Sequence, residues 1–163
     1  MRKAAPMNSR QTVELDAIDW RILEALQADG RASLSSLGKK VGLSQPAVSE
    51  RVKRLESKGV IEGYSARINF RALGLDLLAI ARIKTTFANL QACLKLFESM
   101  PEILEVHRVT GEDCLIVKVL VPRAAQLESV IDRLARYGSV TTSIVLSSTA
   151  PSAITRRLHQ SAP

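Results

Sequence analysis

The side chains with the most capacity for chemistry lie in residues 44–58, where short polar groups precede a run of cations. In chain order these are Ser44, Gln45, Pro46, Ser49, Glu50, Arg51, Lys53 and Arg54. On a helix, Val48, Val52 and Leu55 share one apolar face, and most of the polar residues lie opposite. Short polar groups can bond base edges and cations can neutralise phosphates, so this order is typical of a helix in the major groove of DNA. A solvated amphipathic surface helix is the alternative.

A short helix precedes this one. Ser33 is a good N-cap, the apolar residues within 34–41 recur with helical spacing, and Gly42 supplies the permissive backbone that ends a helix. Ser44 then caps the next helix. Two helices joined at a glycine predict a helix-turn-helix over residues 34–53 and favour DNA binding over the solvated helix.

A third helix, over residues 15–28, is expected to support these two. Its apolar residues form one stripe, and Asp16 and Asp19 favour the positive end of the helix dipole. Trp20 falls off the stripe, which predicts a partly exposed packing role. The three helices would form a compact support for residues 44–58.

Charge is concentrated in the same half of the chain. The 163 residues carry a net charge of +7. Residues 1–71 hold 13 Lys and Arg against 8 Asp and Glu, whereas residues 72–155 hold 8 of each. A basic half joined to a neutral half is expected of a DNA-binding domain with a partner domain.

Composition excludes several other classes of protein. The hydrophobic fraction of 46% indicates a globular chain, and no apolar run approaches the roughly 20 residues of a membrane span. The N-terminus lacks the apolar core of a secretory signal. Cys93 and Cys114 lie in apolar segments without metal-site spacing, which predicts reduced thiols, no metal and a cytoplasmic protein.

The second half alternates between strand and helix patterns. Strands are expected over residues 75–85, 103–110, 114–121 and 140–149, and helices over residues 88–100 and 123–137. The order βαββαβ predicts a ferredoxin-like domain, so the fold class is α+β. One face of such a sheet is left for a partner to cover, and a homodimer would also pair two helix-turn-helix units.

These patterns divide the chain into five parts. They are a flexible basic arm (1–13), a helix-turn-helix domain (14–59), a strand and hinge linker (60–74), a ferredoxin-like ligand-sensing and oligomerisation domain (75–150) and a flexible tail (151–163). Residues 60–70 are expected to be strand-like, with an edge that can pair with another chain.

The motifs LDAIDWRILEALQADGR, VGLS, RVKRLESKGVIEGYSA and VTGEDCLIVKV resemble the leucine-responsive/asparagine-responsive (Lrp/AsnC) family of transcription regulators. The resemblance covers residues 15–149. It implies a winged helix-turn-helix, a C-terminal domain that forms dimers and often octamers, and a nucleoid-associated protein. It also implies a small-molecule effector, usually an amino acid, bound between subunits near the turn after the second strand of that domain.

Carried over onto this sequence, the effector site comprises Val109, Thr110, Gly111, Glu112, Asp113, Thr141 and Ser143. Backbone N–H groups at Gly111 suit a carboxylate, and Asp113 suits an ammonium group. An ordinary hairpin turn is the alternative. Glu112 replaces an aromatic residue found in many members, and Ser36 replaces the Glu of a capping box.

Two further interpretations of function stay open. Octamers of this chain could bend or wrap DNA with little sequence choice, as an architectural protein. A small-molecule enzyme or sensor is the third possibility, but the sequence has no Ser/His/Asp order, paired carboxylates or phosphate-binding glycine loop, so no enzyme is expected. His107 is expected to be exposed or at an interface.

Overall fold

The computed structural model describes residues 13–149 and 152–156, which form two compact units. The helical unit comprises residues 13–67 and 152–156, and the sheet unit comprises residues 68–149. The two units are treated separately below. No helix in the described ranges combines the length and the apolar character needed to cross a membrane.

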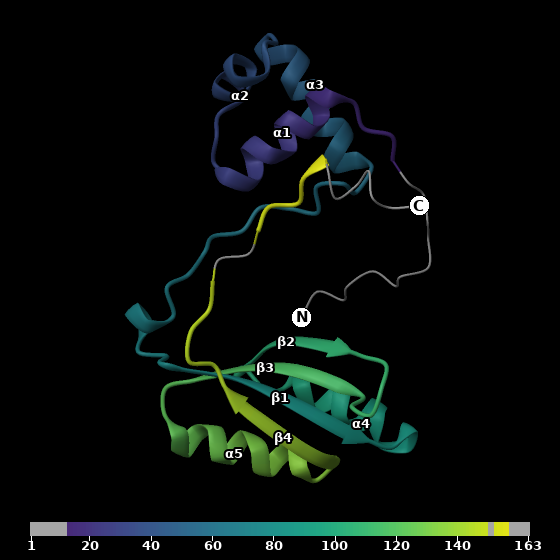
Figure 1. Ribbon diagram of the computed structural model, residues 1–163, viewed down its shortest axis with the longest axis vertical. Coiled ribbons are helices and arrows are strands. Elements are labelled where there is room, and N and C mark those ends of the chain that lie inside the picture. Colours follow the sequence, from purple (N-terminus) through teal and green to yellow (C-terminus); the bar gives the residue numbers. More distant parts are fainter. Residues whose placement is uncertain (1–12, 150–151, 157–163) are drawn as a thin grey trace. The chain divides into compact units, whose positions relative to one another are not determined.

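The helical unit contains α1 (Ala17–Ala28), α2 (Leu34–Val41) and α3 (Gln45–Ser57) (Figure 1). Its main cluster of buried apolar residues comes from all three helices: Ile22, Leu37, Val41, Val48, Val52 and Leu55. The stripes expected on α2 and α3 are therefore confirmed. Trp20 is only 6% exposed, so the expectation of a partly exposed side chain was wrong.

Side-chain caps fix where the three helices begin. The Asp16 carboxylate accepts from the N–H groups of Ile18 and Asp19, and Asp19 accepts in return from the Asp16 N–H. This reciprocal capping box starts α1. Ser33 caps α2 by accepting from the Ser36 N–H at 3.1 Å, as its sequence position predicted.

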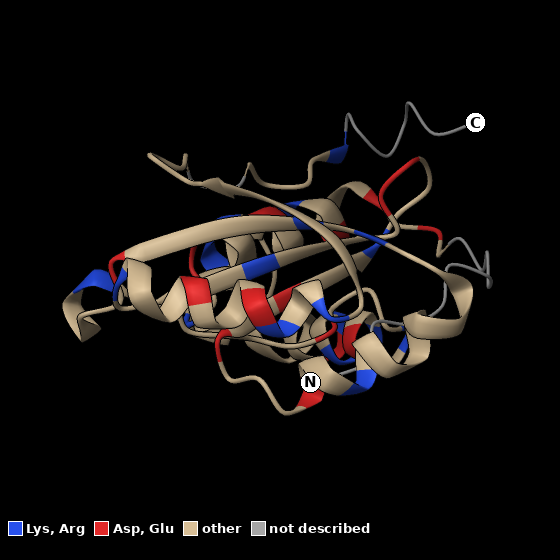
Figure 2. Ribbon diagram, turned by 90° about the horizontal axis from the view of Figure 1, so that it is seen from below, with Lys and Arg blue, Asp and Glu red and all other residues tan. Residues whose placement is uncertain are grey.

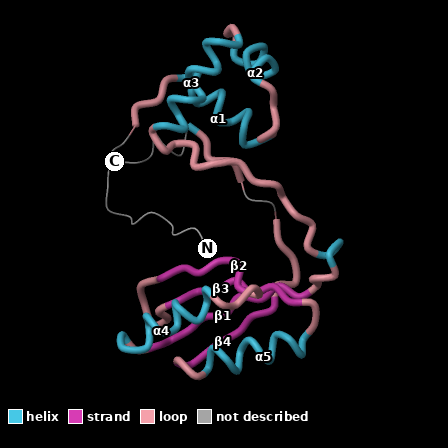
Figure 3. The backbone as a smooth tube through the Cα atoms, turned by 180° about the vertical axis from the view of Figure 1, so that it is seen from behind, coloured by secondary structure: helices cyan, strands magenta, loops and turns pink. Residues whose placement is uncertain are grey.

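Residues 60–70 form no strand, so the strand expected there was wrong. Within the described residues they have no neighbouring strand, and a strand exists only where a second one supplies its hydrogen bonds. The segment is drawn as loop in Figure 3 and leads into a short 3₁₀ helix, η1 (Arg71–Leu73). Tyr64 ties the start of this loop to α3, because its hydroxyl donates to Glu56 at 3.0 Å.

The sheet unit has the expected βαββαβ order. Its elements are β1 (Leu77–Thr85), α4 (Phe87–Glu98), β2 (Ile103–Arg108), β3 (Leu115–Val121), α5 (Ala124–Ala135) and β4 (Gly138–Ile144). All neighbouring strands are antiparallel, in the order β2-β3-β1-β4. The ferredoxin-like fold is thus confirmed. β4 ends before the predicted residue 149 because its paired residues stop at Ile144, opposite Ala79 of β1.

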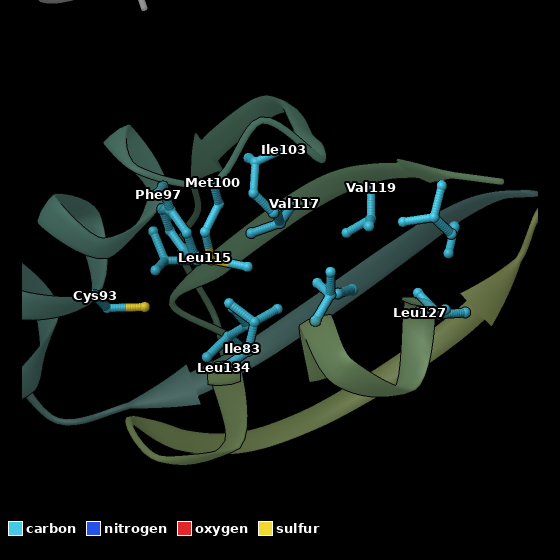
Figure 4. Close-up of a cluster of buried hydrophobic side chains, with 14 of the residues drawn as sticks. Ile83, Cys93, Phe97, Met100, Ile103, Leu115, Val117, Val119, Leu127 and Leu134 are labelled. Carbon is cyan, nitrogen blue, oxygen red and sulfur yellow. The ribbon is translucent and has the colours of Figure 1, made fainter. Parts of the chain in front are cut away.

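Alternate residues of the strands pack under α4 and α5. Ala79, Ala81 and Ile83 of β1 and Leu115, Val117 and Val119 of β3 meet Phe97 of α4 and Leu134 of α5 (Figure 4). Cys93 is buried in this core and Cys114 lies at its edge, and both are free thiols. Burial raises the pKa of Cys93 to about 11, so this thiol is unreactive at neutral pH.

The opposite face of the sheet carries no helix of the sheet unit, since α4 and α5 both lie on one side (Figure 1). We call it the open face. It presents Leu78, Ile80 and Arg82 of β1, Ile116 and Lys118 of β3, Glu105 and His107 of β2, and Thr141 and Ser143 of β4.

Two of the expected parts of the chain lie largely outside the described residues. The basic arm (1–13) is described only at Val13, and the tail (151–163) only over residues 152–156.

Candidate nucleic-acid interface and effector site

Two glycines set the approach of α2 to α3. Gly42 has φ 76°, in the left-handed region, and ends α2 as expected. Gly38 lies inside α2, where a Cβ would come within 2.6 Å of the Leu43 carbonyl oxygen. Any side chain at Gly38 would therefore push the turn away from α2. The sequence analysis did not use this residue, although a glycine inside a helix is a signal of close backbone approach.

The faces of α3 separate as its sequence predicts. Ser44 caps the helix, with its hydroxyl accepting from the Ala47 N–H at 3.5 Å, and Pro46 lies in the first turn. Val48, Val52 and Leu55 are buried. The predicted contact residues Ser44, Gln45, Pro46, Glu50, Lys53 and Arg54 are exposed, and Ser49 and Arg51 are half-buried. We call the group Ser44, Gln45, Pro46, Ser49, Glu50 and Lys53 the contact face.

Arg51 and Arg54 lie on a different side of α3, toward α1. Arg51 Nη1 donates to Asp16 at 2.6 Å and to Asp19 at 2.8 Å. Arg54 Nη2 donates to both carboxylate oxygens of Asp19, at 2.8 and 2.7 Å. Lys53 has no ion-pair partner in the described part of the chain. The three cations of α3 therefore differ: two are paired within the unit and one is available to a ligand.

The pairing also changes proton affinities. The pKa of Asp16 lies below its ordinary value, chiefly because its carboxylate accepts from the Asp19 N–H and also because it accepts from Arg51. Hydrogen bonds to Asp16 and Asp19 raise the pKa of Arg51. Both shifts favour the charged forms, of the Asp16 carboxylate and the Arg51 guanidinium.

The last turn of α2 contributes more positive charge near α3. Lys39 and Lys40 are exposed there. Arg21 of α1 donates to the Lys40 carbonyl oxygen, which satisfies an acceptor at the end of α2. Figure 2 shows basic and acidic residues on both helices and strands. The α2 lysines were missed as candidate sites, although cations in a last helical turn are visible in the sequence.

The predicted effector turn joins β2 to β3. Val109 N–H donates to the Cys114 carbonyl at 3.1 Å, and Gly111 has φ 113°. Thr110 and Glu112 are exposed, and Asp113 is half-buried. The Asp113 carboxylate lies 3.9 Å from Arg82 Nη1 of β1. The turn therefore presents a glycine with positive φ two residues before a carboxylate that has a cationic partner 3.9 Å away.

Arg82 is the functional candidate that sequence reasoning missed. Thr141 lies directly across from Arg82 on the neighbouring strand, and Ser143 lies across from Ile80. The structure thus places Arg82 between the turn and Thr141, with Ser143 one alternate position farther along β4. No local pattern identifies this residue, because the two contacts come from strands far apart in the sequence.

His107 belongs to a separate charged group on the open face. It is 61% exposed, and its Nε2 lies 3.5 Å from Glu105, which also accepts from Lys118 at 2.9 Å. The pKa of Glu105 is lowered, mainly by the hydrogen bond from Lys118. The expected exposure of His107 is confirmed. No cluster of three or more potential metal ligands exists among residues 13–149 and 152–156.

Residues 152–156 return to the helical unit. The Gln27 side chain of α1 donates to the Ile154 carbonyl at 2.8 Å and accepts from the Ile154 N–H at 2.7 Å. One amide thus bonds both backbone groups of a single residue, as a neighbouring strand would. This contact was not predicted.

Two family models match the chain. The AsnC-type helix-turn-helix domain matches residues 15–56. The Lrp/AsnC ligand binding domain matches residues 78–154. Together they span both units.

The chain is also similar to proteins named as HTH-type transcriptional regulators and to a solved structure. The uncharacterized HTH-type transcriptional regulator YezC of Bacillus subtilis is 39% identical over 83% of this chain and 96% of its own length. LrpA of Mycobacterium tuberculosis is 41% identical over 78% of this chain and 86% of its own. The solved structure of LrpC from B. subtilis has a TM-score of 0.81 and 30% identity, and the match covers 86% of this chain and all of that one.

Proposed function

The chain belongs to the Lrp/AsnC family of transcription regulators, and we propose that it binds double-stranded DNA by inserting α3 into the major groove. An α-helix with its side chains is about 10–12 Å across, and the major groove is about 12 Å wide, so α3 fits into the groove. The single observation that carries the proposal is the contact face, which is mostly polar, is exposed except at the half-buried Ser49, and lies opposite the buried Val48, Val52 and Leu55. Ser49 and Glu50 are then the base-reading residues, and Lys53 is a phosphate contact.

Footprinting of the full chain on DNA fragments tests this proposal. Base recognition by a symmetric protein predicts short protected segments repeated at about one helical turn. Uniform protection along the fragment would contradict it and would support the architectural alternative. The relatives carry the names of transcription regulators, which favours regulation over an architectural role. With DNA as its ligand, we place the protein at the nucleoid.

We further propose that the chain forms a homodimer through the open face. Ile80 and Ile116 are half-buried there without a covering helix from their own unit. Large apolar side chains are exposed in the same unit: Ile68, Phe70, Leu73 and Leu146. A second copy would remove this surface from water, and a twofold axis would duplicate the contact face for a palindromic site. Dimers can then assemble further into octamers.

An amino acid is the proposed effector, bound at the turn of residues 109–113. The match of residues 78–154 to a ligand binding domain supports a small molecule. Gly111 N–H and Arg82 suit its carboxylate, and Asp113 suits its ammonium group. Thr141 lies beside Arg82 and Ser143 follows it along β4, so their hydroxyls can complete the site.

Thermal-shift screening against the amino acids tests the effector site. A ligand present at 100 times its Kd stabilises the protein by about 2.7 kcal/mol, which is readily measured. Asp113→Asn is expected to remove the shift. Asp132→Asn is the matched control, because it makes the same change at an exposed position of α5, outside the turn of residues 109–113. A shift that survives Asp113→Asn would place the effector elsewhere.

A further inference from the structure

Asp19 is the one charged residue in the buried class among the described residues, with 1% of its surface exposed. It lies on α1, yet its carboxylate accepts from Arg51 and Arg54 of α3 and from the Asp16 N–H. A buried carboxylate is retained when cations and hydrogen bonds compensate its charge, and losing one partner leaves it uncompensated. The charge of Asp19 is compensated by two arginines and one backbone N–H, and both arginines belong to α3.

The two arginines lie on the same side of α3, three residues apart. Asp19 therefore binds α3 at two points, Arg51 and Arg54. Both points lie outside the apolar face formed by the buried Val48, Val52 and Leu55. A rotation of α3 about its axis would break both contacts together. Apolar side chains alone tolerate such rotations better, because dispersion contacts have no fixed direction.

We propose that Asp19 is the positioning residue of α3: it sets the rotation of the helix and holds Arg51 and Arg54 off the DNA, so that Lys53 supplies the phosphate contact of this helix. The inference rests on the proposed binding of α3 to DNA. It removes Arg51 and Arg54 from the contacts that the sequence predicted.

Burial decides the competition between Asp19 and a phosphate group. If Arg54 turned to DNA, the carboxylate of Asp19 would keep only one cation in a site without water access. Lys53 has no such tie within the described residues, and its flexible ammonium group can follow a phosphate. Arg54 is therefore not available to a DNA phosphate, although 46% of its side chain is exposed.

The matched variants Lys53→Gln and Arg54→Gln test the inference in the full chain. Each removes one positive charge from adjacent positions of α3. For Lys53→Gln we expect the slope of log Kobs against log salt to become shallower by about 0.9 for each bound protomer, with the melting temperature unchanged. For Arg54→Gln we expect an unchanged slope and a melting temperature lowered by at least about 4 °C.

The outcomes separate this inference from the proposed function. A shallower slope for Arg54→Gln with an unchanged melting temperature would overturn the role of Asp19 and leave DNA binding by α3 intact. An unchanged slope for Lys53→Gln would overturn the proposed contact of α3, and the role of Asp19 with it. If Arg54→Gln does not fold, Arg54→Lys replaces it, because lysine pairs with Asp19 more weakly. For Arg54→Lys we again expect an unchanged salt slope and a lowered melting temperature. A shallower slope with an unchanged melting temperature would again overturn the inference.

Asp19→Asn gives a readout that a purely structural role would not change. Loss of the negative charge frees the arginines, so we expect a salt slope steeper by about 1 to 2 for each bound protomer and weaker discrimination between specific and random DNA. Unchanged slope and discrimination in a folded Asp19→Asn variant would overturn the proposal.

Discussion

The two units place their charges in opposite ways. The helical unit buries Asp19 and pairs it with Arg51 and Arg54, whereas every described residue in the buried class of the sheet unit is apolar. The charged side chains of the sheet unit are half-buried or exposed instead, as in the group of Glu105, His107 and Lys118 on the open face. Charged residues thus hold helices together in the helical unit, whereas in the sheet unit they remain available to ligands or partners.

The difference follows from how each unit fixes its geometry. Antiparallel ladders hold β1 between β3 and β4 in a single register, so the sheet unit needs no directional side-chain contact in its core. Three short helices have no such ladder between them. We attribute the buried Asp19 and its ion pairs with α3 to this need, since base recognition depends on which residues of α3 point into the groove.

Leu55→Ala is expected to have the largest effect and to separate the two units. Leu55 is fully buried in the small helical core, and such truncations cost about 2–5 kcal/mol. The helical unit should unfold at lower temperature and DNA binding should be lost, while the sheet unit keeps its transition. Circular dichroism melting with a DNA-binding assay measures both. Leu115→Ala is the reciprocal control, and equal effects of the two variants on one shared transition would contradict independent units.

The sequence predicted the features of this fold that depend on neighbouring residues. The caps Ser33 and Ser44, the permissive Gly42 and the βαββαβ order of elements along the chain all follow from local spacing. The failed strand at residues 60–70 has strand-like composition, but composition does not supply a partner strand.

The candidate sites were less predictable because they depend on distant residues. Arg51 and Asp19 are 32 positions apart, so an ion pair between them is invisible in a pattern of charges. For the same reason a cation run on α3 appeared uniform, and Arg82 was not connected with Asp113. Trp20 was misjudged because helical periodicity counts only one stripe, whereas its ring is covered in the folded unit.

Ile80→Asp should have the next largest effect and should act on the sheet unit alone. The side chain lies on the open face, where a buried carboxylate in a dimer interface would lack a partner. We expect the dimer to weaken by more than about tenfold, which corresponds to about 1.4 kcal/mol. Analytical ultracentrifugation measures this. Gln91→Asp, on the exposed surface of α4, is the control, and an unchanged assembly for Ile80→Asp would contradict the proposed interface.

Gln27→Ala should produce a smaller change that sharpens the boundary between the units. It removes both hydrogen bonds to Ile154, and the pair is exposed, so we expect a loss of about 1 kcal/mol or less from the helical unit. Hydrogen exchange at the Ile154 amide should become faster. Gln91→Ala on α4 should leave that amide unchanged. Equal exchange rates in wild type and Gln27→Ala would show that residues 152–156 do not belong to the helical unit in solution.

Acid titration should reveal the smallest effects, one in each unit. The pKa values of Asp16 and Glu105 are lowered in the folded state, so each group stabilises the fold above its ordinary pKa, and this contribution is lost as pH falls through the lowered value. Both groups are largely exposed, so each effect should stay below about 1 kcal/mol. Asp16→Asn should flatten the acid limb of the helical unit, and Glu105→Gln that of the sheet unit. Urea unfolding between about pH 5 and pH 2 measures both, and a swap of the two effects would contradict the assignment.

The central claim is that the contact face of α3 selects the DNA sequence. Selection of binding sites from a random DNA pool by the wild type and by Glu50→Ala tests it most directly. Glu50 is exposed on this face, so the variant should fold normally and should select a different base at a defined position of each half-site. The account predicts a repeated, phased site for the wild type and this changed preference for Glu50→Ala and for Ser49→Ala. Identical preferences for all three proteins would contradict it.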